Sequence, residues 1–302
     1  MPIHEKGYRH YEGKLRGRLS RSLTIARCGT SLALKKRGLI AMVLLGIAPA
    51  FVLAVLVYQA SRTEEFIKLA GRFIYSSSEW QLLVGKTPTV AVIWQVIFSR
   101  FFIWQLIPVA IVVTYVGPEL ISQDLRVRAL QVYYARPITR LDYVLGKLMV
   151  VAVFVAMLTL VPAVLIYIVG VVLSKSIVVA GETWPTLVGI LGGYLLITVV
   201  AGVLVLACSS LSRRSGSVAV AWAMLVIVTD AAHGLVGEAL GLKWSHLLSL
   251  RANVAQLATR LFDVKPEYAP VHWSASLFVL AAVVVVALGL LFRRVQVLEG
   301  EH

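Results

Sequence analysis

Six long apolar runs constrain this chain more than any other feature of its sequence. An α-helix needs about 20 predominantly apolar residues to cross a bilayer, and each run is about that long or longer. Hydrophobic residues make up 59% of the 302 residues and charged residues only 15%, which leaves too little polar surface for a soluble domain of this size. We therefore predict an all-α polytopic membrane protein, and not a soluble enzyme, a disordered chain or a nucleic-acid-binding domain. The runs cover residues 38–58, 93–116, 143–173, 187–211, 218–236 and 273–292.

The basic residues predict the orientation of these spans. Ten Lys and Arg residues precede the first run, and further basic clusters follow the second, fourth and sixth runs. Loops rich in Lys and Arg stay in the cytoplasm, so both termini are predicted to be cytoplasmic, in a bacterial-type inner membrane. The same basic loops, facing anionic membrane lipid, account for the formal net charge of +14 without a nucleic-acid partner.

The chain ahead of the first run has a helical pattern of its own. Within residues 15–34, leucines recur at helical spacing, and this predicts a basic amphipathic helix on the cytoplasmic membrane surface. A plain basic tail is the alternative. We therefore divide the chain into a cytoplasmic segment, residues 1–37, and a six-helix transmembrane domain, residues 38–302. The basic side chains interleaved in the helix are Arg16, Arg18, Arg21 and Arg27.

The loop between the second and third runs contains a second short amphipathic segment, residues 119–136. Its polar residues fall on one helical face and its apolar residues near another, which suits a surface that docks a soluble partner. Pro137 ends the segment, and Thr139 or Asp142 can cap the following helix. The segment 237–272, on the exterior side, is longer than a connector needs. Its part 245–262 is also amphipathic, so we expect it at the outer interface or over the mouth of a pore.

A few polar residues lie inside the apolar runs and are candidates for a translocation path, because polar groups are costly in lipid. Asp230 and His233 are three residues apart in the fifth run and share one helix face. Gln105 in the second run is a weaker candidate. The alternative is that these side chains form structural hydrogen bonds between helices. Gly189 and Gly193 form a Gly-x-x-x-Gly pair in the fourth run, which we assign to packing within the chain.

Catalytic and metal-binding motifs are missing from the sequence. Gly85-Lys86-Thr87 resembles the end of a phosphate-binding loop, but the glycine required five residues earlier is Trp80. The sequence contains no zinc-protease signature, no paired aspartate motif and no nucleophile elbow. We therefore expect a non-enzymatic chain that binds no metal and no cofactor.

The loop after the second run resembles a known family. Residues 117–124 read Gly-Pro-Glu-Leu-Ile-Ser-Gln-Asp, and residues 133–147 read Tyr-Tyr-Ala-Arg-Pro-Ile-Thr-Arg-Leu-Asp-Tyr-Val-Leu-Gly-Lys. An acidic helix followed by a Ser/Ala-Arg-Pro-x-Ser/Thr-Arg-x-x-Tyr-x-x-x-Lys signature is similar to the ABC-2 family of ABC-transporter permeases. The usual Asp-Gly-Thr piece of many members is replaced by Arg126-Val-Arg128-Ala.

The resemblance implies a type V exporter-like fold and a role as the membrane subunit of an ATP-driven transporter. Segment 119–136 would be the coupling helix, held in a groove of a separately encoded ATPase that binds ATP and Mg. The N-terminal amphipathic helix would be the connecting helix, and a second copy of the chain, or a related permease, would complete the transporter. The residues implied in coupling are Glu119, Asp124, Arg126, Arg128, Arg136, Pro137 and Arg140.

Two other classes of function remain open from the sequence. The chain could transmit ATPase strokes to a periplasmic protein and transport nothing, which the long exterior segment 237–272 would suit. It could also be a proton-coupled secondary carrier that uses Asp230 and His233, although such carriers are typically built from inverted repeats. A neighbouring ATPase gene would favour the transporter subunit and the mechanical role over the secondary carrier.

Overall fold

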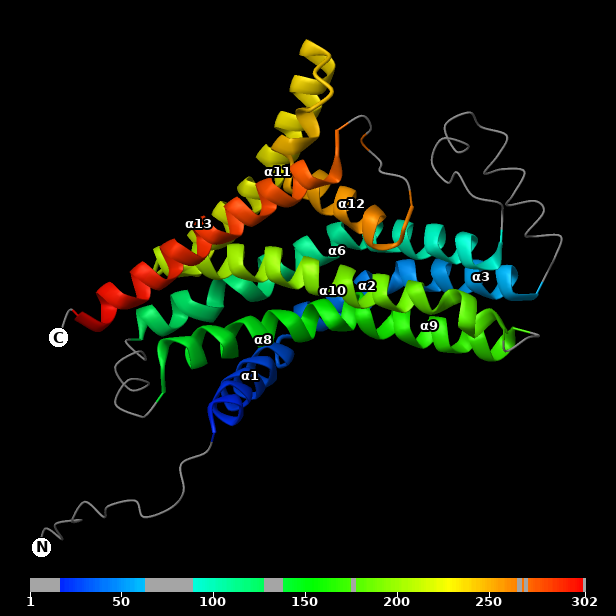
Figure 1. Cartoon of the computed structure of the whole chain (residues 1–302). Coiled ribbons are helices and arrows are strands. Elements are labelled where there is room, and N and C mark those ends of the chain that lie inside the picture. The colour runs from blue at the N-terminus through cyan, green and yellow to red at the C-terminus, as the bar shows by residue number, and fades with distance from the viewer. Residues whose placement is uncertain are drawn as a thin grey trace, which may run out of the picture.

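The structure is a computed structural model that describes residues 17–62, 89–127, 138–174, 178–264, 268 and 271–300. Within these ranges every regular element is a helix (Figure 1). The elements are α1 (Arg18–Leu34), α2 (Arg37–Gly46), α3 (Ala48–Arg62), α6 (Val90–Arg126), α8 (Arg140–Leu158), α9 (Leu160–Leu173), α10 (Val178–Leu211), α11 (Ser215–Leu240), the 3-10 helix η1 (Ser245–Leu248), α12 (Leu250–Leu261) and α13 (Trp273–Gly300).

The predicted number of spans is confirmed for the described residues. Six helical segments are long and apolar enough to cross a membrane, as expected of an integral, multi-pass, all-helical membrane protein. The first span combines α2 with α3, and the third combines α8 with α9. The spans are Arg37–Ser61, Val90–Arg126, Arg140–Leu173, Val179–Leu211, Ser215–Leu240 and Trp273–Gln296.

Helices α6 and α10 form the centre of the bundle. In their most apolar windows 56% and 61% of the residues are buried, more than in any other span. Small residues let the helices approach closely: a Cβ on Gly193 would lie 2.8 Å from the ring of Phe102 in α6, and a Cβ on Gly189 would lie 2.5 Å from Phe262. The assignment of the Gly-x-x-x-Gly pair to packing within the chain is therefore confirmed.

Two of the spans are interrupted near mid-length, and Gln105 of α6 joins the two interruptions. Gly46 ends α2, and Leu158 ends α8. Pro162 has no N–H with which to satisfy the Leu158 carbonyl four residues earlier. The buried Gln105 Nε2 donates to the Leu158 carbonyl oxygen and, at 3.0 Å, to the Gly46 carbonyl oxygen. Gln105 thus ties the first, second and third spans together where two of them break.

The second span runs further than the sequence predicts. We expected it to end at Val116, ahead of a separate helix at 119–136, but α6 continues without interruption to Arg126. The helix continues through Gly117-Pro118, where hydrogen bonds to its backbone come from Ser209 of α10. Its Oγ donates to the Pro118 carbonyl oxygen at 2.7 Å and accepts from the next turn's backbone N–H groups at 3.0 and 3.1 Å.

Helix α1 lies against α8, near one end of the bundle (Figure 1). At this end α6 and α10 terminate and α8 and α11 begin, and we call it the α1 end. The inner face of α1 is buried, with Ile25 seated on Gly146 of α8. Leu19 and Leu23 are exposed, so the helix has both a protein-facing side and an exposed apolar edge. A helix is therefore present in the predicted segment, with apolar residues on two of its sides, and its place on a membrane surface stays a prediction. Arg16 lies outside the described residues.

Helix α11 diverges from the rest of the bundle (Figure 1), and only 11% of its most apolar window is buried. Gly241, at a φ of +60°, adopts the left-handed conformation that ends the helix, so α11 extends past the predicted boundary at 237. The chain then turns back through η1 into α12. Every residue of α12 from 252 to 259 is buried, in contact with α6, α10, α11 and α13. Helix α12 thus packs inside the bundle, and the predicted position of 245–262 at the outer interface or over the mouth of a pore stays a prediction.

Candidate functional site

The start of α8 is fixed in the way the sequence predicts. The Thr139 hydroxyl accepts from the Asp142 backbone N–H at 3.2 Å, and the Asp142 carboxylate accepts from the Thr139 backbone N–H at 3.1 Å. This reciprocal pair is a capping box. Asp142 also lies 3.6 Å from the guanidinium of Arg21, and its carbonyl oxygen accepts from the Ser22 hydroxyl at 3.0 Å. The start of the third span is thereby tied to α1.

The two acidic residues predicted for coupling are held by ion pairs within the chain. Glu119 is paired with Lys36, at the junction of α1 and α2. Asp124 accepts from Lys147 Nζ at 2.6 Å and from the Tyr143 hydroxyl at 2.8 Å, both on α8. The Lys147 and Asp124 side chains are only 9% and 15% exposed, so removing either partner would leave a poorly solvated charge. The last turns of α6 are therefore anchored to α2 on one side and α8 on the other.

The other residues predicted for coupling and for the interfacial helix are less constrained. Arg126 is exposed at the tip of α6, and Arg140 is half-buried at the start of α8. Arg18 and Arg27 are exposed on α1. Arg128, Arg136 and Pro137 lie outside the described residues.

A second feature is a groove of about 750 Å³ between α6, α10, α11 and α12, which we call the Asp230 groove. Its walls are almost entirely apolar, with Leu106 and Ile111 from α6 and Ile197 from α10. Asp230 of α11 and Arg251 of α12 also line it, and they place one carboxylate and one guanidinium in an otherwise apolar wall.

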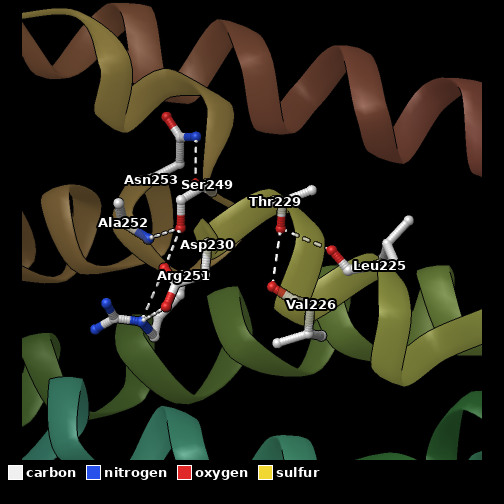
Figure 2. A network of polar contacts seen from close by, with 8 residues as sticks. All are labelled: Leu225, Val226, Thr229, Asp230, Ser249, Arg251, Ala252 and Asn253. Carbon is white, nitrogen blue, oxygen red and sulfur yellow. Dashed lines mark hydrogen bonds and ion pairs between the residues drawn. The ribbon is translucent and has the colours of Figure 1, made fainter. Parts of the chain in front are cut away.

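Figure 2 shows how Asp230 is bound. Its carboxylate oxygens accept from Arg251 Nε at 3.0 and 3.2 Å, and Oδ1 also accepts from the Ser249 hydroxyl at 2.8 Å. Ser249 caps α12 at the same time, because its Oγ accepts from the Ala252 backbone N–H at 3.0 Å. Asn253 Nδ2 donates to the Ser249 carbonyl oxygen at 2.7 Å. One aspartate of α11 therefore fixes the start of the buried helix α12.

Asp230 and His233 share a helix but not a site. His233 Nδ1 lies 3.1 Å from the Ser245 hydroxyl and its ring meets Tyr268 edge-on at 5.5 Å. The ring of His246 stacks on the same tyrosine at 5.0 Å, and burial lowers the pKa of His246. His233 and Gln105 do not line the Asp230 groove. Of the three residues predicted for a translocation path, the structure places Asp230 alone in this groove.

Sequence reasoning missed the partners of these acidic residues. The sequence analysis pairs none of Lys36, Lys147 and Arg251 with an acidic residue. An apolar helix that contains one carboxylate needs a nearby cation or donor, so a search for basic residues at the ends of neighbouring spans would have produced these candidates. It would not have chosen among them, because 21 residues and a chain reversal separate Asp230 from Arg251.

Comparisons with protein-family models and with curated proteins find no match to this chain. We therefore argue the function from the arrangement of α1, the α6 tip and the Asp230 groove.

Proposed function

We propose that this chain is the permease subunit of an ATP-driven transporter of the ABC-2 type, in a bacterial-type inner membrane with the α1 end in the cytoplasm. The observation that carries the proposal is the continuity of α6. This single helix of 37 residues, about 55 Å long, carries predicted coupling residues at its tip and lines the Asp230 groove with its middle. A push at the tip would move a wall of the groove directly.

In this mechanism a separately encoded ATPase binds ATP and Mg and grips segment 119–136. Closure of the ATPase displaces the tip of α6. The ion pairs of Glu119 with Lys36 and of Asp124 with Lys147 pass this displacement to α2 and α8. The capping box and Arg21 hold α1, the connecting helix of this proposal, to the start of α8, so the two helices move together. This chain hydrolyses no nucleotide itself.

The Asp230 groove supports a hydrophobic or amphiphilic cargo moved in the export direction. Its walls match an apolar chain, and the ion pair of Asp230 with Arg251 offers a polar group one charge of each sign. The sparse burial of α11 leaves an apolar helix surface, including Met224 and Ile227, against which a second copy of the chain or a related permease could pack. Two copies would then enclose the grooves between them.

A mechanical role is the second candidate, and α12 favours it. Asp230 links α11 to the start of α12, and α12 belongs to the long segment after the fifth span. An ATPase-driven displacement of α11 would therefore also move the segment after the fifth span, to which a periplasmic protein could bind. A proton-coupled carrier is less favoured, because Asp230 and His233 are bonded to different partners.

The test is capture of the ATPase from native membranes. The tagged chain is solubilised in mild detergent and purified, and the ATP hydrolysis of the eluate is measured together with the identity of any protein that co-purifies. We expect an ATPase that is lost from the Arg136→Glu variant and retained by Arg293→Glu, a matched charge reversal on the exposed end of α13. An eluate without an ATPase, or equal retention by both variants, would contradict the proposal. Uptake of a fluorescent amphiphile by inverted vesicles then separates export from a mechanical role.

A further inference from the structure

A second groove, of about 520 Å³, lies at the α1 end between α1, the last turns of α6 and the start of α11. We call it the α1 groove. It differs from the Asp230 groove in charge, because four cations and two carboxylates line it. The charged residues are Lys36, Glu119, Asp124, Arg126, Lys147 and Arg213.

Two of these cations have no counter-charge among the described residues. Lys36 is paired with Glu119 and Lys147 with Asp124, so both carboxylates of the groove are already engaged. Arg126 and Arg213 form no ion pair with any described residue, and both are exposed. The α1 groove is therefore an anion-attracting surface lined by two exposed guanidinium groups, the side chains that best bind phosphate oxygens.

The start of α11 adds to this field. Ser215, its first residue, lines the groove, and the preceding Arg214 makes no side-chain capping bond. No acidic residue occupies the first turn of α11. Its N–H groups therefore reinforce the charge of the two arginines, although the site depends on the arginines and on the groove.

Apolar side chains lie at the same groove. Leu32 of α1, Tyr115 of α6 and Val127 just after α6 all line it, and all three are exposed. A free inorganic anion would gain nothing from such residues, whereas the glycerol and upper acyl segments of a lipid would cover them. The first span begins beside Lys36, so the groove lies level with the end of a membrane-crossing helix.

We propose that the α1 groove binds the headgroup of an anionic phospholipid from the adjacent leaflet, with its phosphate between Arg126 and Arg213 and its acyl chains along Leu32 and Tyr115. The lipid would bridge α1, the α6 tip and the start of α11. The ion pairs of Lys36 and Lys147 tie the α6 tip to the junction of α1 and α2 and to α8, and neither of them reaches α11. The inference goes beyond the proposed transporter function, since it requires only that this end of the bundle meets a membrane surface.

The experiment is a lipid competition on the full-length chain. The protein is purified in a non-ionic detergent with equal amounts of phosphatidylglycerol and phosphatidylcholine, and bound lipids are counted by native mass spectrometry over a range of lipid concentrations. The variant Arg126→Gln with Arg213→Gln is compared with Arg214→Gln and Arg293→Gln, which removes two exposed arginines that do not line the groove. Elution from a sizing column confirms that each variant is folded.

We expect preferential retention of phosphatidylglycerol, weakened about fivefold for each groove arginine removed and unchanged in the control pair. Three results would overturn the inference: equal retention of the two lipids, equal weakening in both double variants, or no weakening in the groove variant. Displacement of the lipid by millimolar inorganic phosphate would also overturn it, because the site would then select the free ion. None of these outcomes depends on whether an ATPase co-purifies.

Discussion

Replacement of Gln105 by methionine should destabilise the bundle without changing its shape. Methionine fills a similar volume in the buried position but offers no N–H donor. The carbonyl oxygens of Gly46 and Leu158, both at interruptions of spanning helices, would then lose the bonds that Gln105 Nε2 supplies. Both carbonyl groups lie away from water, since Gly46 and Leu158 are buried together with Gln105.

The expected loss follows from these two carbonyl groups. An unsatisfied buried polar group costs about 1–3 kcal/mol, whereas hydrogen bonds between membrane helices average about 0.6 kcal/mol. The Gln105 amide oxygen is itself buried and has no hydrogen-bond partner in the described part of the chain. Methionine removes this unpaired oxygen, which offsets part of the lost stability. We therefore expect a net decrease of about 1–3 kcal/mol in the free energy of unfolding.

Thermal unfolding of the full chain in detergent measures this decrease. At about 2–4 °C per kcal/mol, the Tm of Gln105→Met should fall by roughly 2–12 °C. Gln95→Met is the matched control, because Gln95 is a buried glutamine of the same helix that makes no hydrogen bond within the described residues. The control should stay close to the parent. Equal Tm values for the two variants would refute the role of Gln105 as a bridge between helix interruptions.

Three further perturbations follow from the ion pairs and from the buried histidine. Lys147→Met should lower the free energy of unfolding by about 3 kcal/mol, and combining it with Asp124→Leu should restore much of the loss, because the carboxylate no longer lacks a cation. A double-mutant cycle of Asp230→Asn and Arg251→Gln should give a coupling of about 1 kcal/mol or less, since the two side chains lie partly open in the Asp230 groove and hydrogen bonds between membrane helices average about 0.6 kcal/mol. Burial lowers the pKa of His246, so its neutral form stabilises the fold above about pH 6.5 and this contribution is lost as the pH falls below that value. His246→Phe, which keeps the stacking on Tyr268, should therefore show a smaller fall in Tm between pH 7.5 and 5.5 than the parent.

Each of these expectations has a result that contradicts it. If the double replacement at Lys147 and Asp124 is as unstable as Lys147→Met alone, the loss comes from packing and not from an unpaired carboxylate. A coupling of several kcal/mol between Asp230 and Arg251 would mean that the pair is shielded from solvent. Identical pH profiles for the parent and His246→Phe would assign the acid sensitivity to other groups.

The number and order of the spans could be predicted from the sequence because the length of an apolar run is a local property. The Thr139 capping box was also predictable, since all its atoms lie within four residues of the chain. The end of the second span was not predictable in this way. Helix α6 runs through Gly117-Pro118, and its backbone there is bonded by Ser209, a residue 91 positions away from Pro118.

The candidate site was predicted less completely, for the same reason. Helical spacing grouped Asp230 with His233, but long-range contacts decided their partners. The turn at Gly241 returns the chain into the bundle, so Asp230 meets Ser249 and Arg251 while His233 meets Ser245. Gln105 was chosen as a polar residue in an apolar run, and its position between two helix interruptions was not visible in the sequence.

The central claim, that an ATPase in the cytoplasm drives this chain through the tip of α6, requires that tip to face the cytoplasm. Labelling of single cysteines tests this orientation, in a chain whose native Cys28 and Cys208 are replaced by serine. One cysteine replaces Val127, beside the tip of α6, and another replaces Glu182, near the end of α10 that lies away from the α1 end. A membrane-impermeant thiol reagent should label Val127→Cys only in inverted vesicles and Glu182→Cys only in right-side-out vesicles. The reverse pattern would place the tip outside the cell, where no cytoplasmic ATPase could grip it.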